Sequence, residues 1–360
     1  MAIAAFRVGI VQCRGTPYEV GRAQAHLFAA TPKGRAFIHR KKIRFPWWFD
    51  IRAEQRAFAA FSPALWEEIS GLADGLGIPM ARAALCFGNN GLRPPTGGCS
   101  AVISPGVYGR NYDYKPRHYG ARFVLLQASG SHASVGASEL LTGRLDGMNE
   151  HGLVIGLHLV RPSPRYPGFS CVLIVRMVLD QCATTEEAVV MLRRLPHAMP
   201  YNYSLLDAEG AAAVVEAVPG CVAVRTGVWL ACTNHFQSPL LRPLSRRAAR
   251  SQDRLPPLEA WAARGLNADA MFLALNRSTS PAFHHGYRRG AGTLHTIVAE
   301  PTKKRLLIGI GGDAAALDED MVDLNFAQWV HGEDLPIAHL QGQLGGTSHP
   351  FEWPVPRRRS

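Results

Sequence analysis

The sequence lacks the long apolar runs of membrane proteins. Its 360 residues are 47% hydrophobic and 19% charged, yet no segment approaches the roughly 18 consecutive apolar residues that span a bilayer. Residues 1–12 also lack the basic start, long apolar stretch and small-residue cleavage site of a secretory signal. We therefore expect a globular protein with a large core, located in the cytoplasm and without a membrane partner.

Paired cysteines are absent as well, because the cysteines are odd in number and form no C-x-x-C motif. The seven stand at positions 13, 86, 99, 171, 182, 221 and 232. This spacing argues against a disulfide framework or a zinc site, and we expect no metal and no cofactor. Five cysteines have apolar neighbours and are expected to be small buried residues: Cys86, Cys171, Cys182, Cys221 and Cys232.

Acidic residues are fewer than basic ones, 28 against 39, which gives a net charge of +11. Arginines are densest over residues 242–254. No helix-turn-helix, zinc-finger or RNA-binding pattern accompanies them, so a solvated helix face is favoured over a nucleic-acid site. The same charge would attract an anionic substrate, such as a carboxylate or a CoA thioester. A non-catalytic protein that binds anions or nucleic acid is the alternative from a different class.

The distribution of apolar and turn residues favours an α+β fold. Residues 1–98 resemble a helical leader, with a capping box at 16–19 that predicts a helix over 20–28, and helical periodicity over 51–73. Hairpin-like strands and blocks of helix follow, which argue against a parallel sheet. We expect strands near 99–104, 107–112, 122–129, 132–138, 141–146, 152–159, 203–207, 212–217, 221–225, 228–232, 293–299 and 304–310, and helices near 170–195, 244–264 and 267–276.

Cys99 differs from the other cysteines because it follows two glycines and opens an apolar strand. A cysteine nucleophile needs a base. The α-amino group of the same residue serves once it is the chain terminus, since its unperturbed pKa is about 7.7–8.0. Gly98 tolerates the strained geometry in which the thiol attacks the preceding carbonyl. The pattern predicts self-cleavage between Gly98 and Cys99.

The strand of Cys99 is followed, after a Pro105-Gly106 turn, by a strand that carries Arg110 and Asp113. A hairpin of this kind would bring both side chains beside Cys99. There the cation would lower the thiol pKa, and the carboxylate would hold the terminal ammonium. The alternative is an Arg–Asp pair that only closes the hairpin.

Taken together, the motifs resemble the choloylglycine hydrolase and penicillin acylase group. The likeness is greatest to its acyl-CoA:6-aminopenicillanate acyltransferase-like branch, peptidase family C45. The motifs that carry it occupy 15–21, 68–75, Cys99 with 109–113, 147–153, 156–158, 207–210 with Glu216, 233–236 and 251–254. The resemblance covers most of the chain, and the order and spacing of the motifs are more specific than any one of them.

The resemblance implies a four-layer αββα N-terminal-nucleophile hydrolase sandwich, with two antiparallel sheets and helices outside. Residues 1–98 would be a pro-segment that departs or stays bound as a small subunit. Residues 99–350 would form the catalytic domain, and 351–360 a basic tail.

The resemblance also implies roles for particular residues. Cys99 would be nucleophile and base, flanked by Arg110 and Asp113. The side-chain amide of Asn234 and the backbone N–H of His158 would stabilise the oxyanion. Arg254 would support the nucleophile, although three other arginines lie close enough for a register error: Arg246, Arg247 and Arg250. Outside this set, Asn149 and Glu150 are expected to stabilise a turn, and His235 to be structural or to line a pocket.

The activity implied is that of an amidase, activated from a zymogen by autoproteolysis, which cleaves linear non-peptide C–N bonds through a Cys99 acyl-enzyme. Hydrolysis is narrowly preferred over acyl-CoA-dependent N-acyl transfer. The expected partners are a small-molecule amide or acyl-CoA substrate and the chain's own pro-segment, with no nucleic acid, and the oligomeric state is left open. A homologue that kept the fold but lost the activity is a further alternative.

Overall fold

The computed structural model describes residues 3–40, 45–46, 49–88, 98–160, 166–245, 249–287, 291–311, 321–337 and 339–345. Its strands are β1 (Ile3–Gly15), β2 (Gly98–Ser104), β3 (Val107–Tyr114), β4 (Arg122–Ala128), β5 (Ser134–Glu139), β6 (Gly143–Arg144), β7 (Asp146–Asn149), β8 (Val154–Leu159), β9 (Tyr201–Leu206), β10 (Ala212–Val218), β11 (Cys221–Thr226), β12 (Leu230–Cys232), β13 (Gly292–Glu300), β14 (Arg305–Gly311), β15 (Met321–Asn325) and β16 (His339–Gly345). Its α-helices are α1 (Pro17–Ala29), α2 (Pro32–His39), α3 (Ile51–Phe61), α4 (Pro63–Leu76), α5 (Met80–Phe87), α6 (Cys171–Gln181), α7 (Thr185–Arg194), α8 (Ala249–Ala263), α9 (Ala268–Asn276) and α10 (Phe326–Val330).

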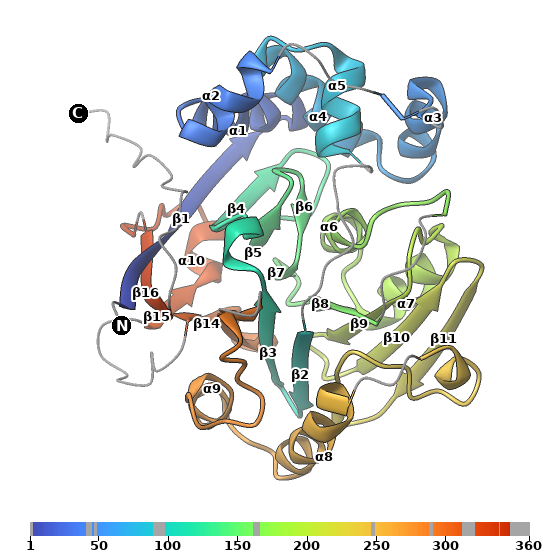
Figure 1. Ribbon diagram of the computed structural model, residues 1–360, viewed down its shortest axis with the longest axis vertical. Coiled ribbons are helices and arrows are strands. Elements are labelled where there is room, and N and C mark those ends of the chain that lie inside the picture. Colours follow the sequence, from blue (N-terminus) through green and yellow to red (C-terminus); the bar gives the residue numbers. More distant parts are fainter. Residues whose placement is uncertain are drawn as a thin grey trace.

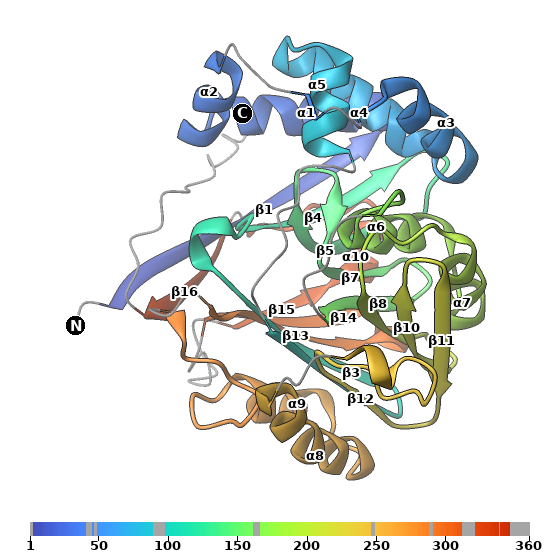
Figure 2. The same cartoon turned by 45° about the vertical axis from the view of Figure 1, so that its right-hand side comes forward.

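The strands follow one hydrogen-bonded path, β11-β10-β9-β8-β7-β5-β4-β1-β16-β14-β13-β3-β2-β12. This path folds back on itself, so that β2 packs against β8 and two layers of strands face each other (Figure 1). Helices α6 and α7 cover one layer, whereas α8 and α9 cover the other (Figure 2). The expected α+β class, with two facing layers of strands and helices outside, is confirmed. The layers are joined through β1 and β16, and the β1–β4 and β14–β16 pairs are parallel.

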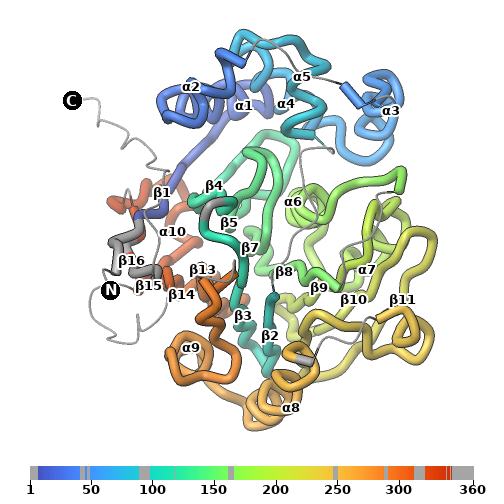
Figure 3. Tube along the Cα trace, in the orientation of Figure 1, coloured from blue at the N-terminus to red at the C-terminus, as the bar shows by residue number. Residues whose placement is uncertain are grey.

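The leader contains a strand that the sequence analysis does not anticipate. Helices α1 to α5 gather at one end of the molecule, but β1 enters the sheet (Figure 3). There it pairs with β4 on one side and β16 on the other. Both partners are remote in sequence, so no local hairpin signal marks this strand. The leader is therefore part of the central sheet and not only a helical cover.

Helices α1 and α4 approach each other closely through glycine. A Cβ on Gly21 would lie 2.0 Å from the Glu68 carbonyl oxygen, and one on Gly71 would lie 2.0 Å from that of Tyr18. The capping box predicted at Thr16 is present, with reciprocal bonds to Glu19. These contacts give a physical reason for the glycines of the leader motifs.

Most strands expected after residue 98 are present, with bounds that shift by a few residues. The helix expected over 170–195 is two helices, because the chain breaks at Cys182 and Thr184 caps the second. Strands β15 and β16 and helix α10 were not anticipated. Cys171, Cys182 and Cys232 are buried as expected, but Cys86 and Cys221 are only half-buried. The tail at 351–360 lies outside the described residues. In the described ranges no helix has the length and apolar character needed to cross a bilayer.

Candidate active site

Cys99 lies on β2 and is only 3% exposed. In the β2–β3 hairpin it stands opposite Tyr112, while Ala101 faces Arg110 and Gly98 faces Asp113. Side chains alternate between the faces of a strand. Arg110 is therefore on the same face as Cys99, and Asp113 is on the opposite face, toward α8. The hairpin brings both residues close to the predicted cleavage point, but on different sides of it.

Arg110 is the cation next to the thiol. Its Nη2 lies 3.5 Å from Cys99 Sγ and donates to the Leu157 carbonyl oxygen at 2.5 Å. Burial raises the pKa of the Cys99 thiol to about 11, although Arg110 acts to lower it. The thiol of the uncleaved chain is therefore protonated at neutral pH.

The opposite face of the hairpin holds Asp113 and Arg254. Arg254, on α8, donates to Ser100 Oγ at 2.7 Å and to Asp113 Oδ2 at 3.3 Å. Thr293 donates to the other Asp113 oxygen at 2.7 Å. Burial raises the pKa of Asp113 even though Arg254 opposes the shift. Of the arginines that compete for this position, Arg254 is in the site. Arg250 bonds instead to His284, and the other two, at 246 and 247, lie outside the described residues.

Asn234 joins the two faces at the backbone of Cys99. Its Oδ1 accepts from Cys99 N at 2.9 Å and from Arg254 Nη2 at 2.7 Å. Its Nδ2 donates to the Leu159 carbonyl oxygen at 2.8 Å. The Asn234 side-chain amide thus binds the backbone of both Cys99 and Leu159.

The backbone N–H of His158 does not face the site, contrary to the expectation. The carbonyls of Leu157 and Leu159 point to Arg110 and Asn234. Successive backbone groups of a strand point to opposite edges. The His158 backbone therefore points to β9, where this residue pairs with Asn202. Its side chain is buried, with Nε2 2.8 Å from Ser204 Oγ, and burial holds the pKa of the ring well below its ordinary value.

A buried network behind Arg110 escaped the sequence analysis. Asp146 accepts from Arg110 Nη1, and His295 Nε2 lies 2.8 Å from the same carboxylate oxygen. The other ring nitrogen of His295 lies 2.7 Å from the Tyr119 hydroxyl. Arg110, Asp146 and His295 have no exposed surface. Burial acts to raise the pKa of Asp146, but His295 and Arg110 together keep it below its ordinary value. No motif connects these residues in sequence.

The expectations for Asn149 and His235 are confirmed. Asn149 stabilises the β7–β8 turn, because its Oδ1 accepts from the backbone N–H groups of His151 and Leu153. His235 is structural, with Nδ1 2.8 Å from Ser251 Oγ, and it lines a cleft of about 530 Å³. The cleft is also lined by Phe236, Gln237, Arg242, Ser245, Gln252 and Leu255.

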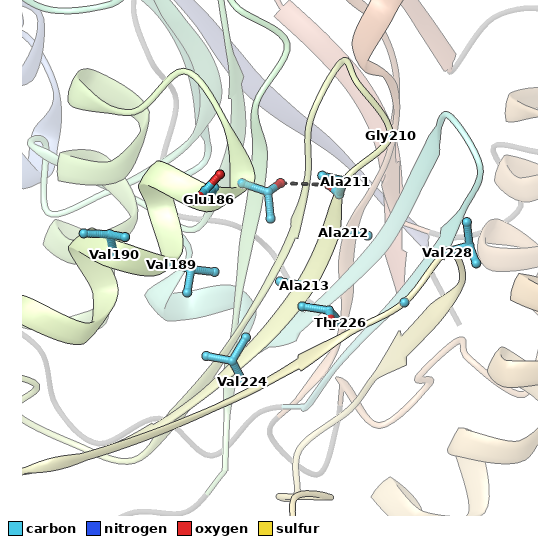
Figure 4. Close-up of a pocket in the computed structure, with 12 residues that line it drawn as sticks. Glu186, Val189, Val190, Gly210, Ala211, Ala212, Ala213, Val224, Thr226 and Val228 are labelled. Carbon is cyan, nitrogen blue, oxygen red and sulfur yellow. Dashed lines mark hydrogen bonds between the residues drawn. The ribbon is translucent and has the colours of Figure 1, made fainter.

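A second cavity, of about 590 Å³, lies between α7 and the β10–β11 hairpin (Figure 4). Its lining is mostly aliphatic and includes Val189, Val190, Val224 and Val228. None of the predicted site residues lines this cavity.

Comparisons with known proteins bear on the family. Residues 102–315 match the family model described as acyl-coenzyme A:6-aminopenicillanic acid acyl-transferase. Cys99 lies just before this segment. A comparison with curated proteins gave no match.

Three solved structures show similarity to the chain. Penicillin V acylase from Agrobacterium tumefaciens has 20% identity over 66% of this chain and 80% of its own, with a TM-score of 0.37. The Caenorhabditis elegans ortholog of N-acylethanolamine-hydrolyzing acid amidase has 18% identity over 57% and 93%, with a TM-score of 0.41. The C2A mutant of conjugated bile acid hydrolase from Clostridium perfringens has 13% identity over 70% and 98%, with a TM-score of 0.40.

The family match covers more than half of the chain and includes the strands that carry Arg110, Asp113 and Asp146. The chain therefore belongs to the acyl-coenzyme A:6-aminopenicillanic acid acyl-transferase family.

Proposed function

We propose that this protein is an autoproteolytically activated amidase that cleaves linear amides through a Cys99 acyl-enzyme. The observation that carries the proposal is the surroundings of the Gly98–Cys99 peptide. Arg110 stands 3.5 Å from the thiol, and the Cys99 nitrogen is held by Asn234 at 2.9 Å. A cation beside the attacking sulfur and a hydrogen-bond partner on the nitrogen of the scissile bond suit cleavage of the Gly98–Cys99 peptide.

The space around Gly98 supports glycine at the cleavage point. A Cβ there would lie 3.1 Å from Arg254 Nη2, 3.2 Å from Asp113 Oδ2 and 3.3 Å from Asn234 Oδ1. These distances are tighter than ordinary contacts, so any larger residue would push the polar groups away from the peptide. Three polar groups thus converge on Gly98, whose carbonyl carbon the thiol would attack in an N→S acyl shift.

The maturation step needs no reactant other than the chain itself and one water molecule. Cys99 sulfur attacks the Gly98 carbonyl carbon, the C–S bond forms, the C–N bond breaks, and the thiol proton ends on the Cys99 nitrogen. Water then hydrolyses the thioester, which releases the Gly98 carboxylate and restores the thiol. The freed amine has an ordinary pKa of about 7.7–8.0 and becomes the base that the uncleaved site lacks.

In turnover, the amine takes the thiol proton and the thiolate attacks the substrate carbonyl. The remaining Nδ2 hydrogen of Asn234 is available to the oxyanion, and donors of this kind contribute about 3–4 kcal/mol to transition-state stabilisation. The amine then protonates the leaving nitrogen, and water hydrolyses the acyl-enzyme. Arg110 stabilises the thiolate throughout.

Acyl transfer from acyl-CoA to an amine is the second candidate at the same site. The description of the family favours it, and so does charge, because CoA is anionic and the chain carries a net charge of +11. Arg242 lines the same cleft as His235. Assays of the cleaved protein with acyl-CoA, with and without an acceptor amine, distinguish the two: an N-acylated product supports transfer, and free acid alone supports hydrolysis.

The deciding experiment is an intact-mass measurement on the wild-type chain beside Cys99→Ala and Cys99→Ser variants. We expect two wild-type fragments that meet at Gly98–Cys99, an uncut alanine variant, and no turnover by either variant on N-acyl amino acids, β-lactam side-chain amides or acyl-CoA donors. A single uncut wild-type chain would reduce the protein to an inactive homologue. Wild-type turnover by Cys99→Ala would remove Cys99 from the mechanism.

A further inference from the structure

A group of potential metal ligands lies outside the candidate active site. His132 stands in the β4–β5 loop, and Glu150 and His151 stand in the β7–β8 turn. His132 Nδ1 lies 3.1 Å from His151 Nε2 and 3.6 Å from Glu150 Oε1. All three ligand atoms fall within 4.8 Å of one another, and among the described residues no hydrogen bond or ion pair joins this group to Cys99 or Arg110.

Backbone hydrogen bonds hold the two segments in register. The Glu150 N–H donates to the Ala133 carbonyl at 2.8 Å, and the Ala133 N–H donates to Glu150 Oε1 at 2.9 Å. The His132 N–H donates to the Asp180 carbonyl at 2.9 Å. The fold therefore already holds the three side chains close together, so that binding an ion would cost little further conformational entropy.

The donor set indicates which ions fit. Ligands bound to one ion at about 2.0–2.2 Å lie about 3–4 Å apart, which is the range of the two separations above. Two imidazoles with one carboxylate suit zinc and its neighbours in the first transition row, whereas magnesium and calcium prefer oxygen ligands alone. His132 and Glu150 have side chains 30% and 28% exposed, so water can complete the coordination shell.

We propose that His132, Glu150 and His151 form a binding site for a divalent transition-metal ion of the zinc type. Such an ion would link the β4–β5 loop to the β7–β8 turn and stabilise that edge of the fold. The cysteine pattern led to the expectation of no metal. These three ligands have no recognisable spacing in the sequence, and only the fold brings them together.

The test uses the full chain after chelator treatment and dialysis, titrated with ZnCl₂ and followed by equilibrium dialysis with elemental analysis. The variants are His132→Ala and His151→Ala. A third, Glu150→Gln, keeps an oxygen that can accept from the Ala133 N–H and so guards against misfolding. The matched control is His331→Ala, which removes an exposed histidine after α10.

We expect the wild-type chain and the control to bind one more equivalent of zinc than His132→Ala and His151→Ala. We also expect at least tenfold weaker binding at this site in Glu150→Gln. Zinc should raise the melting temperature of the wild-type chain, whereas magnesium at the same concentration should not. The same zinc stoichiometry and affinity in all four variants would overturn the proposal, as would the absence of any saturable equivalent in the wild type. Both readouts are independent of Cys99, so the proposed function can fail without affecting this result.

Discussion

At the scale of single residues, the candidate site contains buried charged side chains, and the partners of each side chain determine where it is held. The Arg110 guanidinium makes contact with the Cys99 thiol, but it is tied to the protein by Leu157 and Asp146. A buried ion pair adds little net stability when intact, yet the loss of one partner leaves an uncompensated charge. Asp146 is therefore expected to keep Arg110 at its place beside the thiol.

The change Asp146→Asn tests this arrangement. It should destabilise the fold by about 3–5 kcal/mol. It should also slow cleavage at Gly98–Cys99 at least tenfold in the molecules that remain folded, because Arg110 loses its charged partner. Chemical denaturation measures the first effect, and a time course of intact mass at low temperature measures the second.

Asp323→Asn is the matched control for that variant. Asp323 pairs with Arg305 at 2.7 Å on the surface, where ion pairs contribute about 0–1 kcal/mol. Equal cleavage rates in wild type, Asp146→Asn and Asp323→Asn would show that the Asp146 carboxylate does not position Arg110.

At the scale of elements, the leader helices depend on close backbone approach. Glycines of α1 and α4 lie against the partner helix, and Tyr18 and Gln24 of α1 bond to Asp74 and Glu68 of α4 at 2.7 Å each. Glu68 also pairs with Arg176 of α6 at 2.7 Å, which ties the leader to the catalytic layers. The separation of the two helices therefore affects how the leader docks.

The change Gly71→Ala should force α1 and α4 apart, because the added Cβ would meet the Tyr18 carbonyl at 2.0 Å. We expect a loss of about 1–3 kcal/mol, typical of overpacking, measured by thermal or chemical unfolding. Gly227→Ala is the control, since the nearest atom to its added Cβ is at 3.4 Å. A Gly71→Ala variant as stable as this control would mean that the helices separate without cost.

At the scale of the whole molecule, the leader contributes a strand to the central sheet. It would have to separate from this sheet if it departed after cleavage. Strand β1 pairs with β4 over residues 9–15 and with β16 over residues 3–9. Val8, Ile10 and Val11 are buried, so removal of the leader would expose apolar surface and two strand edges. We therefore expect residues 1–98 to remain bound as a small subunit after cleavage.

Size-exclusion chromatography of the cleaved protein tests this expectation. Both fragments should elute together at the volume of the uncleaved Cys99→Ala chain and separate only in denaturant. Two peaks under native conditions would identify the leader as a departing pro-segment, and the catalytic part would then need a different cover for β4 and β16.

The parts of this protein that could be predicted from sequence have local causes. The capping box at Thr16 involves neighbours three residues apart. The hairpin that joins Cys99 to Arg110 needs only a Pro105-Gly106 turn and the period of a strand. The turn sets the register of the hairpin, and the register decides which face of the hairpin each side chain occupies. Motif order was specific enough to identify the family.

The features that only the tertiary structure decided are contacts between residues far apart in the sequence. Asp146 meets Arg110 from 36 positions away and His295 from 149, while β1 lies between strands that follow it by more than 100 residues. The orientation of the His158 backbone and the grouping of His132 with Glu150 depend equally on which strands are neighbours. Local sequence determines which residues can form a strand or a turn. Burial of the two strand layers against each other determines which of those residues share a site, because that choice depends on apolar surface drawn from the whole chain.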